Sequence, residues 1–270
     1  MHNEIITIGK VTIYGYGLMI GIGILCAYLL TEYRAKKQKL DNEPIFNIAI
    51  IAVVFGFLSA KLLYIITVFD KILSGQWGHI NIRDGFVVYG GIIGGIISVL
   101  IYCRIKKLHF LTYMDLVIPA VSLAQGFGRI GCFLAGCCYG METQSWFSIT
   151  FTHSHYAPNN VPLFPSQLVS SAFDFALAAL LCFIAKKELL NDSEIGDVPS
   201  KGPVSKAPGT IGALYLTLYS VGRFIIEFFR GDIERGSVGT LSTSQFISIF
   251  TFAAGILMFV FIRKQNKAIK

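Results

Sequence analysis

The 270-residue sequence predicts an all-α integral membrane protein with seven transmembrane helices, an external N-terminus and a cytoplasmic C-terminus. Its residues are 54% hydrophobic and 14% charged, whereas a typical soluble domain is about 45–50% apolar and about 25% charged. A helix needs about 20 apolar residues to cross a bilayer, and seven apolar runs approach that length: 11–31, 45–69, 86–103, 111–136, 167–185, 209–229 and 243–262. This composition excludes a soluble or disordered chain.

The distribution of lysine and arginine sets the predicted orientation of these helices. Fifteen of these residues fall in the segments 34–43, 104–110, 186–208 and 263–270, and five fall in the segments on the opposite side. Positive charge collects on cytoplasmic loops, so the four segments are predicted to be cytoplasmic and the N-terminus external. The net charge of +7 has the same explanation, and we expect no nucleic-acid partner.

We expect residues 1–270 to form a single polytopic membrane domain. Residues 141–165 contain neither lysine nor arginine, which predicts an external loop. Residues 186–208 are polar and rich in Lys, Asp, Ser and Pro, which predicts a flexible cytoplasmic loop. The first apolar run lacks a short positive leader and a cleavage site, so we expect it to be retained as a span.

Polar side chains inside apolar runs are costly and usually mark function. With the predicted orientation, the notable ones converge on the outer half of the membrane. They are Tyr14, Tyr16, Tyr89, Arg129, Ser166, Gln167, Arg223, Glu227, Arg230 and the cysteines between 132 and 138. This convergence predicts a site that opens to the outer leaflet or to the space beyond it.

The run 209–229 and the residue that follows it predict an anion site. Tyr219, Arg223, Glu227 and Arg230 are spaced four, four and three apart, which places them on one helical face. The planar guanidinium of Arg223 can donate paired hydrogen bonds to a phosphate, and Arg129 can donate to the same group. A phospholipid headgroup would supply this phosphate. The alternative is an Arg223–Glu227 ion pair that only joins helices.

Two tyrosines near the outer surface are further candidates. Tyr16 and Tyr89 each precede a glycine, and glycine lets a ligand or another backbone approach closely. The alternative for each tyrosine is simple anchoring at the membrane interface.

The stretch GRIGCFLAGCCYG (128–140) is dense in glycine and cysteine. It holds half of the six cysteines: Cys132, Cys137 and Cys138, whereas Cys26, Cys103 and Cys182 lie in apolar runs. The stretch predicts either a break in the helix that lines a polar cavity or close packing of small residues. A disulfide between Cys137 and either Cys132 or Cys138 is a further alternative. A metal site completed by His153 and His155 is another, although the cysteine spacing is not a standard zinc signature.

The order of these motifs resembles the prolipoprotein diacylglyceryl transferase family over nearly the whole chain. The matching elements are YGLM (16–19), DG-x-x-x-YGGIIGG (84–95), GRIG…G (128–140), PSQL (165–168), Y-x3-RF-x2-EFFRGD (219–232) and Ser244-Gln245. No single element is decisive, but the order and spacing of five of them in a seven-span chain are specific.

The resemblance implies an enzyme at the outer face of the bacterial cytoplasmic membrane. Members of the family transfer the diacylglyceryl group of phosphatidylglycerol to the lipobox cysteine thiol of a prolipoprotein, and glycerol 1-phosphate leaves. This is the first step of bacterial lipoprotein maturation. The implied partners are phosphatidylglycerol, prolipoprotein signal peptides and the lipid bilayer, and neither a cofactor nor a metal is implied. Seven helices and an external N-terminus are also the family's layout.

The resemblance also assigns site residues in this sequence. The implied catalytic residues are Tyr16, Tyr89, Arg129 and Arg223. The implied substrate-binding residues are Gly90, Gly91, Arg129, Cys132, Cys137, Gly140, Gln167, Tyr219, Arg223 and Glu227. In this interpretation Arg223 holds the phosphate, and the glycines leave room for acyl chains.

The chain departs from the family's usual signature, GRxGNFxNGExxG. Cys132, Ala135 and Cys137 stand where Asn, Asn and Glu are usual, Tyr89 stands where many members have His, and residues 169–170 are not the usual Tyr-Glu. Loss of the histidine removes a convenient general base near neutral pH. Two alternatives follow: thiol-dependent acyl or disulfide chemistry on the same scaffold, and a phospholipid-binding membrane protein without catalysis.

Overall fold

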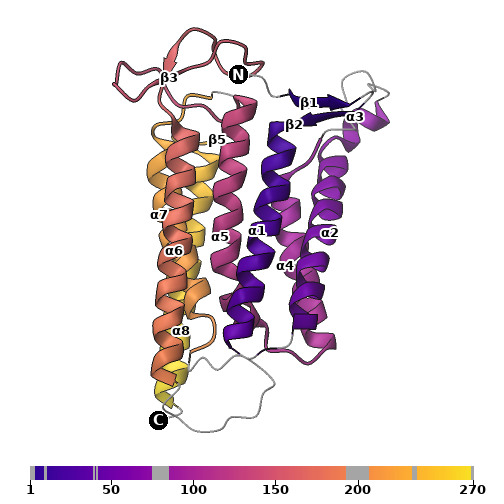
Figure 1. The fold of residues 1–270 in the computed structure, drawn as a ribbon, viewed down its shortest axis with the longest axis vertical. Coiled ribbons are helices and arrows are strands. Elements are labelled where there is room, and N and C mark those ends of the chain that lie inside the picture. Colours follow the sequence, from indigo (N-terminus) through magenta and orange to yellow (C-terminus); the bar gives the residue numbers. More distant parts are fainter. Residues whose placement is uncertain are drawn as a thin grey trace. The chain divides into compact units, whose positions relative to one another are not determined.

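The computed structural model describes residues 4–8, 11–38, 40, 42–74, 85–192, 207–232 and 236–268. The described chain is predominantly helical (Figure 1), with seven helices of 18 residues or more and one short helix. They are α1 (Gly15–Lys37), α2 (Asn42–Thr67), α3 (Phe69–Leu73), α4 (Val88–Ile105), α5 (Phe110–Ala135), α6 (Ser166–Asp192), α7 (Thr210–Glu227) and α8 (Thr243–Ala268). The predicted all-helical class is confirmed.

Short antiparallel hairpins accompany the helices. They pair β1 (Glu4–Ile8) with β2 (Val11–Tyr14), β3 (Ile149–Thr150) with β4 (Pro162–Leu163), and β5 (Ser237–Val238) with β6 (Leu241–Ser242). Of the predicted loop 186–208, residues 193–206 lie outside the described part, and α6 continues to Asp192.

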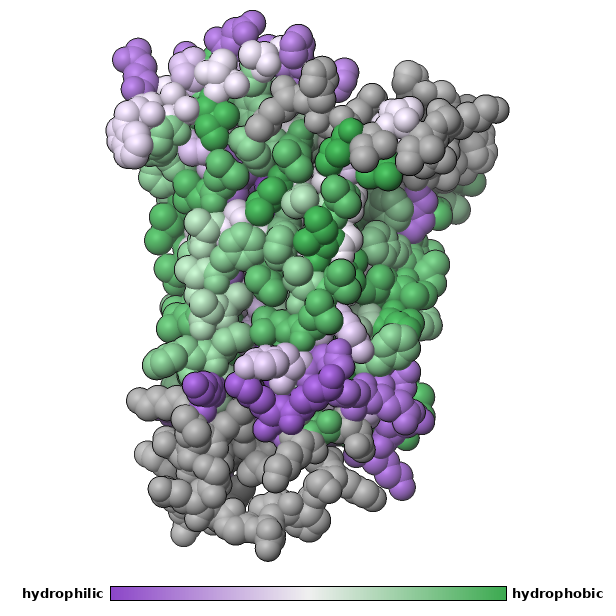
Figure 2. All heavy atoms as spheres, in the orientation of Figure 1, coloured by the Kyte–Doolittle hydropathy of each residue, from purple (hydrophilic) through white to green (hydrophobic). Residues whose placement is uncertain are grey.

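Six of the long helices are apolar and long enough to cross a membrane: α1, α2, α4, α5, the Ser166–Lys186 part of α6, and α8. The exposed surfaces of the long helices are mostly hydrophobic (Figure 2), with large exposed side chains such as Leu58, Phe183 and Leu257. The protein is therefore a helical integral membrane protein. Helix α7, which corresponds to the run 209–229, is absent from this group because Tyr, Ser, Arg and Glu interrupt its apolar residues. The count of seven spans and the orientation of the termini stay predictions.

The chain forms two compact units, each described by itself. The first comprises Met1–Thr31, Met114–Val198 and Val204–Lys270, and so contains most of α1 and α5 together with α6, α7 and α8. The second comprises Glu32–Tyr113 and Pro199–Pro203, and its helices α2 and α4 pack against each other.

In the first unit, small residues let α7 approach its neighbours closely. A methyl group on Gly222 would lie 2.1 Å from Phe173 of α6, and one on Gly255 of α8 would lie 2.6 Å from Thr217. Lipid tails are as apolar as leucine, so helices in a bilayer associate through such tight packing rather than through the hydrophobic effect. Helix α7 is thus held between α6 and α8, and this position shelters its polar residues from lipid.

In the second unit, the glycines of α4 serve the contact with α2. A methyl group on Gly90 would lie 2.6 Å from the carbonyl oxygen of Ser59, and one on Gly91 would lie 3.2 Å from that of Gly56. The backbone of α2 therefore fills the space that Gly90 leaves open.

A buried carboxylate on α5 determines where α7 begins. Asp115 accepts hydrogen bonds from the backbone N–H groups of Gly209 (2.6 Å) and Gly212 (2.8 Å). Gly209 has φ +98°, in the left-handed region, and offers no side chain to cap the helix. Asp115 thereby satisfies N–H groups that have no partner within α7, and its negative charge lies at the positive end of the helix dipole. This contact fixes the register of α7 against α5.

Replacing Asp115 tests the strength of this contact. We expect Asp115→Ala to lower the free energy of unfolding by about 1–3 kcal/mol, because it leaves buried N–H groups without an acceptor. Thermal unfolding of the purified protein in detergent measures the change. The control is Glu43→Ala, which removes an exposed carboxylate from the first turn of α2. Equal melting temperatures for both variants would contradict the assigned role.

Candidate active site

The site begins at the carboxyl end of α5, which carries Arg129 and Cys132. Helix α5 continues unbroken to Ala135 and ends at Gly136, whose φ of +74° suits glycine. The N–H of Gly136 donates to the carbonyl of Phe133 (3.1 Å), and the N–H of Cys137 donates to the carbonyl of Cys132 (3.1 Å). This pattern is a Schellman motif, which folds the chain back over the last turn. The predicted break inside the helix is therefore an ordinary helix end.

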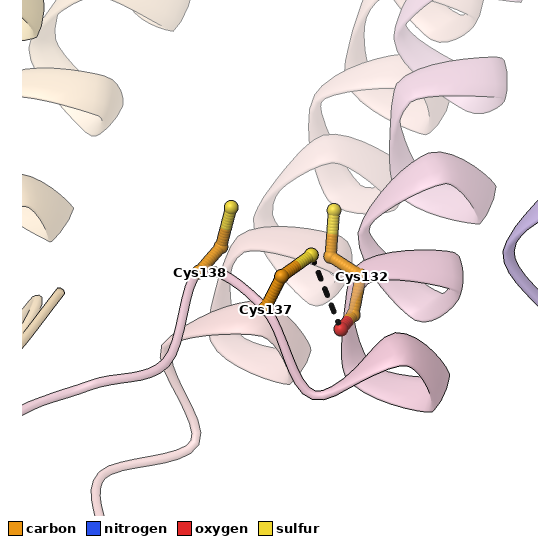
Figure 3. A group of neighbouring side chains, drawn as sticks. All are labelled: Cys132, Cys137 and Cys138. Atoms are coloured by element: carbon orange, nitrogen blue, oxygen red, sulfur yellow. Dashed lines mark hydrogen bonds between the residues drawn. The ribbon is translucent and has the colours of Figure 1, made fainter. Parts of the chain in front are cut away.

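The fold-back brings the three cysteines of this stretch together (Figure 3). The sulfur atoms of Cys132, Cys137 and Cys138 all lie within 4.8 Å of one another. All three are free thiols, so the alternative of a disulfide is not realised in this structure. The group contains neither His153 nor His155.

The loop thiols differ in acidity. Hydrogen bonds from Cys132 and Cys137 lower the pKa of the Cys138 thiol, and nearby Arg230 and Arg129 act in the same direction against burial. Hydrogen bonding with the other two thiols, together with burial, raises the pKa of Cys137.

Residues at the start of α6 hold the loop in place. The Ser166 hydroxyl donates to the carbonyl of Cys138 (2.9 Å), and the Gln167 amide donates to that of Cys137 (2.9 Å). Gln167 is only 2% exposed. Its predicted contact with substrate stays a prediction, and the role that its geometry supports is positioning of the loop.

Gly140 and Met141, which follow the cysteines, join the ends of α5, α6 and α7. Met141 donates its N–H to the carbonyl of Phe229 (2.9 Å) beyond α7, and accepts from the N–H of Phe164 (2.8 Å) just before α6. Gly140 lies inside this crossing, where a methyl group would be 2.2 Å from the carbonyl oxygen of Phe164. Only glycine fits there.

The predicted polar face of α7 forms a chain of ion pairs at the end of the helix. The Glu227 carboxylate is 2.9 Å from the Arg223 guanidinium and 3.7 Å from that of Arg230. Arg230 also donates two hydrogen bonds to Asp232, at 3.1 and 2.7 Å. Arg223 donates to the Ser244 hydroxyl at the start of α8 (2.9 Å). The Arg223–Glu227 pair therefore exists, but it belongs to a larger network.

Arg129 and Arg223 line the same small cavity. The other lining residues are Ser170, Phe173, Asp174, Tyr219 and Ile226. Within the part of the chain that the structure describes, Arg129 forms neither an ion pair nor a hydrogen bond. Its guanidinium donors are thus available to a bound anion. This agrees with the predicted role of Arg129 as a second anion-binding arginine beside Arg223.

Asp174 is a site residue that the motifs of the sequence did not indicate. Asp174 is 2% exposed, and its carboxyl interacts electrostatically with Arg129 and Arg223, although among the described residues it forms an ion pair with neither. The two arginines thus face a carboxyl in addition to Glu227. A signal was present, since Gln167, Ser170 and Asp174 make a polar stripe at helical spacing in an apolar run.

Tyr16 lies near the same group, at the start of α1. Its ring packs against Gly131, where a methyl group would be 3.1 Å from Cδ2. It interacts electrostatically with Arg129 and with the three thiols of the loop, and it is 41% exposed. Tyr89, Gly90 and Gly91 belong to the second unit, so their contribution to the site stays a prediction.

Comparison with known proteins places the chain in a family. The model of the prolipoprotein diacylglyceryl transferase family matches residues 3–261. The phosphatidylglycerol–prolipoprotein diacylglyceryl transferase of Clostridium tetani is 47% identical over 247 residues, which are 92% of this chain and 92% of that protein. Transferase 2 of that name from Clostridium perfringens is 44% identical over 250 residues, which are 92% and 90% of the two chains.

The fold and the site define a helical integral membrane protein with paired arginines at a buried cavity. The chain belongs to the prolipoprotein diacylglyceryl transferase family, which confirms the resemblance seen in the sequence. It is therefore a transferase.

Replacing Gly140 tests the crossing of the three chain segments. We expect Gly140→Ala to reduce transfer activity by at least about tenfold, because the backbone oxygen of Phe164 is not free to move out of the way. Activity and thermal stability are measured together in membranes and in detergent. Gly21→Ala is the matched control, since a methyl group there meets nothing within 4 Å. Full activity of Gly140→Ala would show that the crossing is not required.

Proposed function

We propose that the protein transfers the diacylglyceryl group of phosphatidylglycerol to the lipobox cysteine thiol of prolipoproteins at the outer face of the bacterial cytoplasmic membrane. Glycerol 1-phosphate is the leaving group. Members of the family at 44–47% identity carry the name of this reaction.

The observation that carries the proposal is the pair of arginines at one cavity. An arginine in an apolar bundle is costly unless an anion compensates it. Arg223 has Glu227, whereas Arg129 forms no ion pair with any described residue and shares the Asp174 carboxyl with Arg223 only through electrostatic interaction. One carboxyl between two arginines leaves positive charge at the cavity. The phosphate of a phospholipid supplies the anion, and its oxygen atoms accept the paired hydrogen bonds that each planar guanidinium donates.

The reaction is a displacement at the glyceryl carbon that bears the phosphate ester. The substrate's cysteine thiolate attacks this carbon, a carbon–sulfur bond forms, and the carbon–oxygen bond to phosphate breaks with its electrons on oxygen. Arg129 and Arg223 stabilise the negative charge that develops on the leaving phosphate. The proton of the thiol, whose ordinary pKa is about 8.5, passes to a base, for which Tyr16 and Tyr89 are the candidates.

The proposed topology has seven spans, with α7 as the sixth span of the sequence prediction. The N-terminus is external and the C-terminus cytoplasmic, because Lys and Arg concentrate in the predicted cytoplasmic segments. In this orientation the carboxyl ends of α5 and α7 lie in the outer leaflet, so the arginines meet phospholipid headgroups there. Tyr219, which lines the same cavity, completes the proposed substrate site, and Gln167 positions the loop that follows α5.

Reconstitution tests the reaction and the arginines together. Purified protein in phosphatidylglycerol vesicles is given a lipobox peptide, and the peptide mass and the released glycerol phosphate are followed. We expect a diacylglyceryl-sized mass gain with matching glycerol phosphate. Arg129→Ala and Arg223→Ala should each reduce the rate by about 10²–10³-fold, as does loss of one stabilising donor in other enzymes.

The control is Arg263→Ala, which removes an exposed arginine that lies over the Phe259 ring. Unchanged turnover in Arg223→Ala would overturn the proposed role of this residue. Lipid binding without glycerol phosphate release would instead favour the phospholipid-binding protein. The close group of thiols keeps the thiol-dependent alternative open, and full transfer by a variant with all three cysteines replaced by serine would exclude it.

Reporter fusions test the proposed orientation. The positive charge of residues 263–270 is expected to retain the C-terminus in the cytoplasm. A green fluorescent protein fused there should fluoresce, and an alkaline phosphatase fused at the same position should be inactive. Strong phosphatase activity with no fluorescence would reverse the orientation.

A further inference from the structure

The three thiols at the end of α5 form a cluster that the transfer reaction does not require, because its nucleophile is the substrate's own thiol. The helix end creates this cluster. In the Schellman motif that ends α5, Cys132 and Cys137 occupy the two positions whose side chains meet. Cys138 then has φ +57°, and its side chain points in the same direction as that of Cys132 (Figure 3).

The spacing of the sulfur atoms suits one metal ion. A metal–thiolate bond of about 2.3 Å with tetrahedral angles places two sulfur atoms about 3.8 Å apart. The three sulfur atoms already lie within 4.8 Å of one another. Closing around an ion therefore needs side-chain movements of about 1 Å or less, which small changes of χ1 provide.

The backbone beneath the cluster is held by the end of α5 and by two side chains at the start of α6. The Schellman hydrogen bonds fix Cys137, and side chains of Ser166 and Gln167 fix the carbonyls of Cys138 and Cys137. Ligands on a prearranged backbone lose little conformational entropy when an ion binds. The cluster is also half-buried, so an ion can reach it.

The charge and chemistry of the surroundings select the kind of ion. Thiolates prefer soft cations such as Zn²⁺ and Cu⁺ over Mg²⁺ and Ca²⁺. Three thiolates around Zn²⁺ or Cu⁺ leave net negative charge, and Arg129 and Arg230 lie close enough to interact with Cys138. The arginines therefore stabilise the occupied cluster.

We propose that Cys132, Cys137 and Cys138 bind a single soft d¹⁰ cation, Zn²⁺ or Cu⁺, through three thiolates, with one coordination position open. A disulfide uses only two of the three sulfur atoms, whereas an ion uses all of them. The three thiol protons pass to solvent on binding. The inference is independent of the transfer reaction, because binding is measured directly.

The test titrates the reduced, metal-free protein in detergent with Cd²⁺, a soft d¹⁰ probe whose bonds to thiolate absorb in the ultraviolet. We expect one Cd²⁺ per chain, protection of three of the six thiols from alkylation, and displacement of Cd²⁺ by Zn²⁺ or Cu⁺. Which of these two ions displaces Cd²⁺ at the lower concentration identifies the preferred occupant.

Two matched triple variants locate the site. Replacing Cys132, Cys137 and Cys138 by serine should abolish the absorbance, whereas replacing Cys26, Cys103 and Cys182 by alanine should leave it unchanged. The single variant Cys138→Ser should lose about a third of the absorbance and more than about 100-fold in affinity.

Three results would overturn the proposal. One is equal Cd²⁺ uptake by the two triple variants. Another is no uptake by protein in which all six thiols are reduced and react with the alkylating agent. The third is a bond between two of the cluster cysteines that resists reduction, which would favour a disulfide.

Discussion

The hydrogen bonds between the Asp115 carboxylate and the start of α7 are the constraint on which the site depends. They join α5 to α7 at one end of both helices. Because both helices are rigid, the register set there also aligns Arg129 of α5 with Arg223 of α7 at the other end, where the two side chains line one cavity. A buried carboxylate is tolerated at this position because backbone donors and the helix dipole compensate its charge.

The segment from Gly136 to Met141 joins α5, α6 and α7 at the end of the bundle opposite to Asp115. Its left-handed glycine ends α5, its cysteine carbonyls accept hydrogen bonds from α6, and its last residues pair with the chain on both sides. The same backbone path therefore places three thiols beside the arginines. In this fold the arginine site and the thiol cluster have one common scaffold.

Part of the site was predictable from local sequence. The 3.6-residue period is enough to place Arg223, Glu227 and Arg230 on one face, and the structure has them in one network. Asp174 and Ser244 were not predicted as partners, because α6 and α8 contribute them from distant parts of the chain. The local sequence around each holds no sign of the arginine that it faces.

Hydropathy and helical periodicity, which depend on neighbouring residues only, were sufficient to determine the helical membrane class, the long helices and the polar face of α7. The motif order was sufficient to determine the family. Only the tertiary structure decided that Gln167 holds a loop carbonyl and that Gly90 serves helix packing. These outcomes depend on contacts between segments far apart in sequence, where the available space and hydrogen-bond partners are set by the fold.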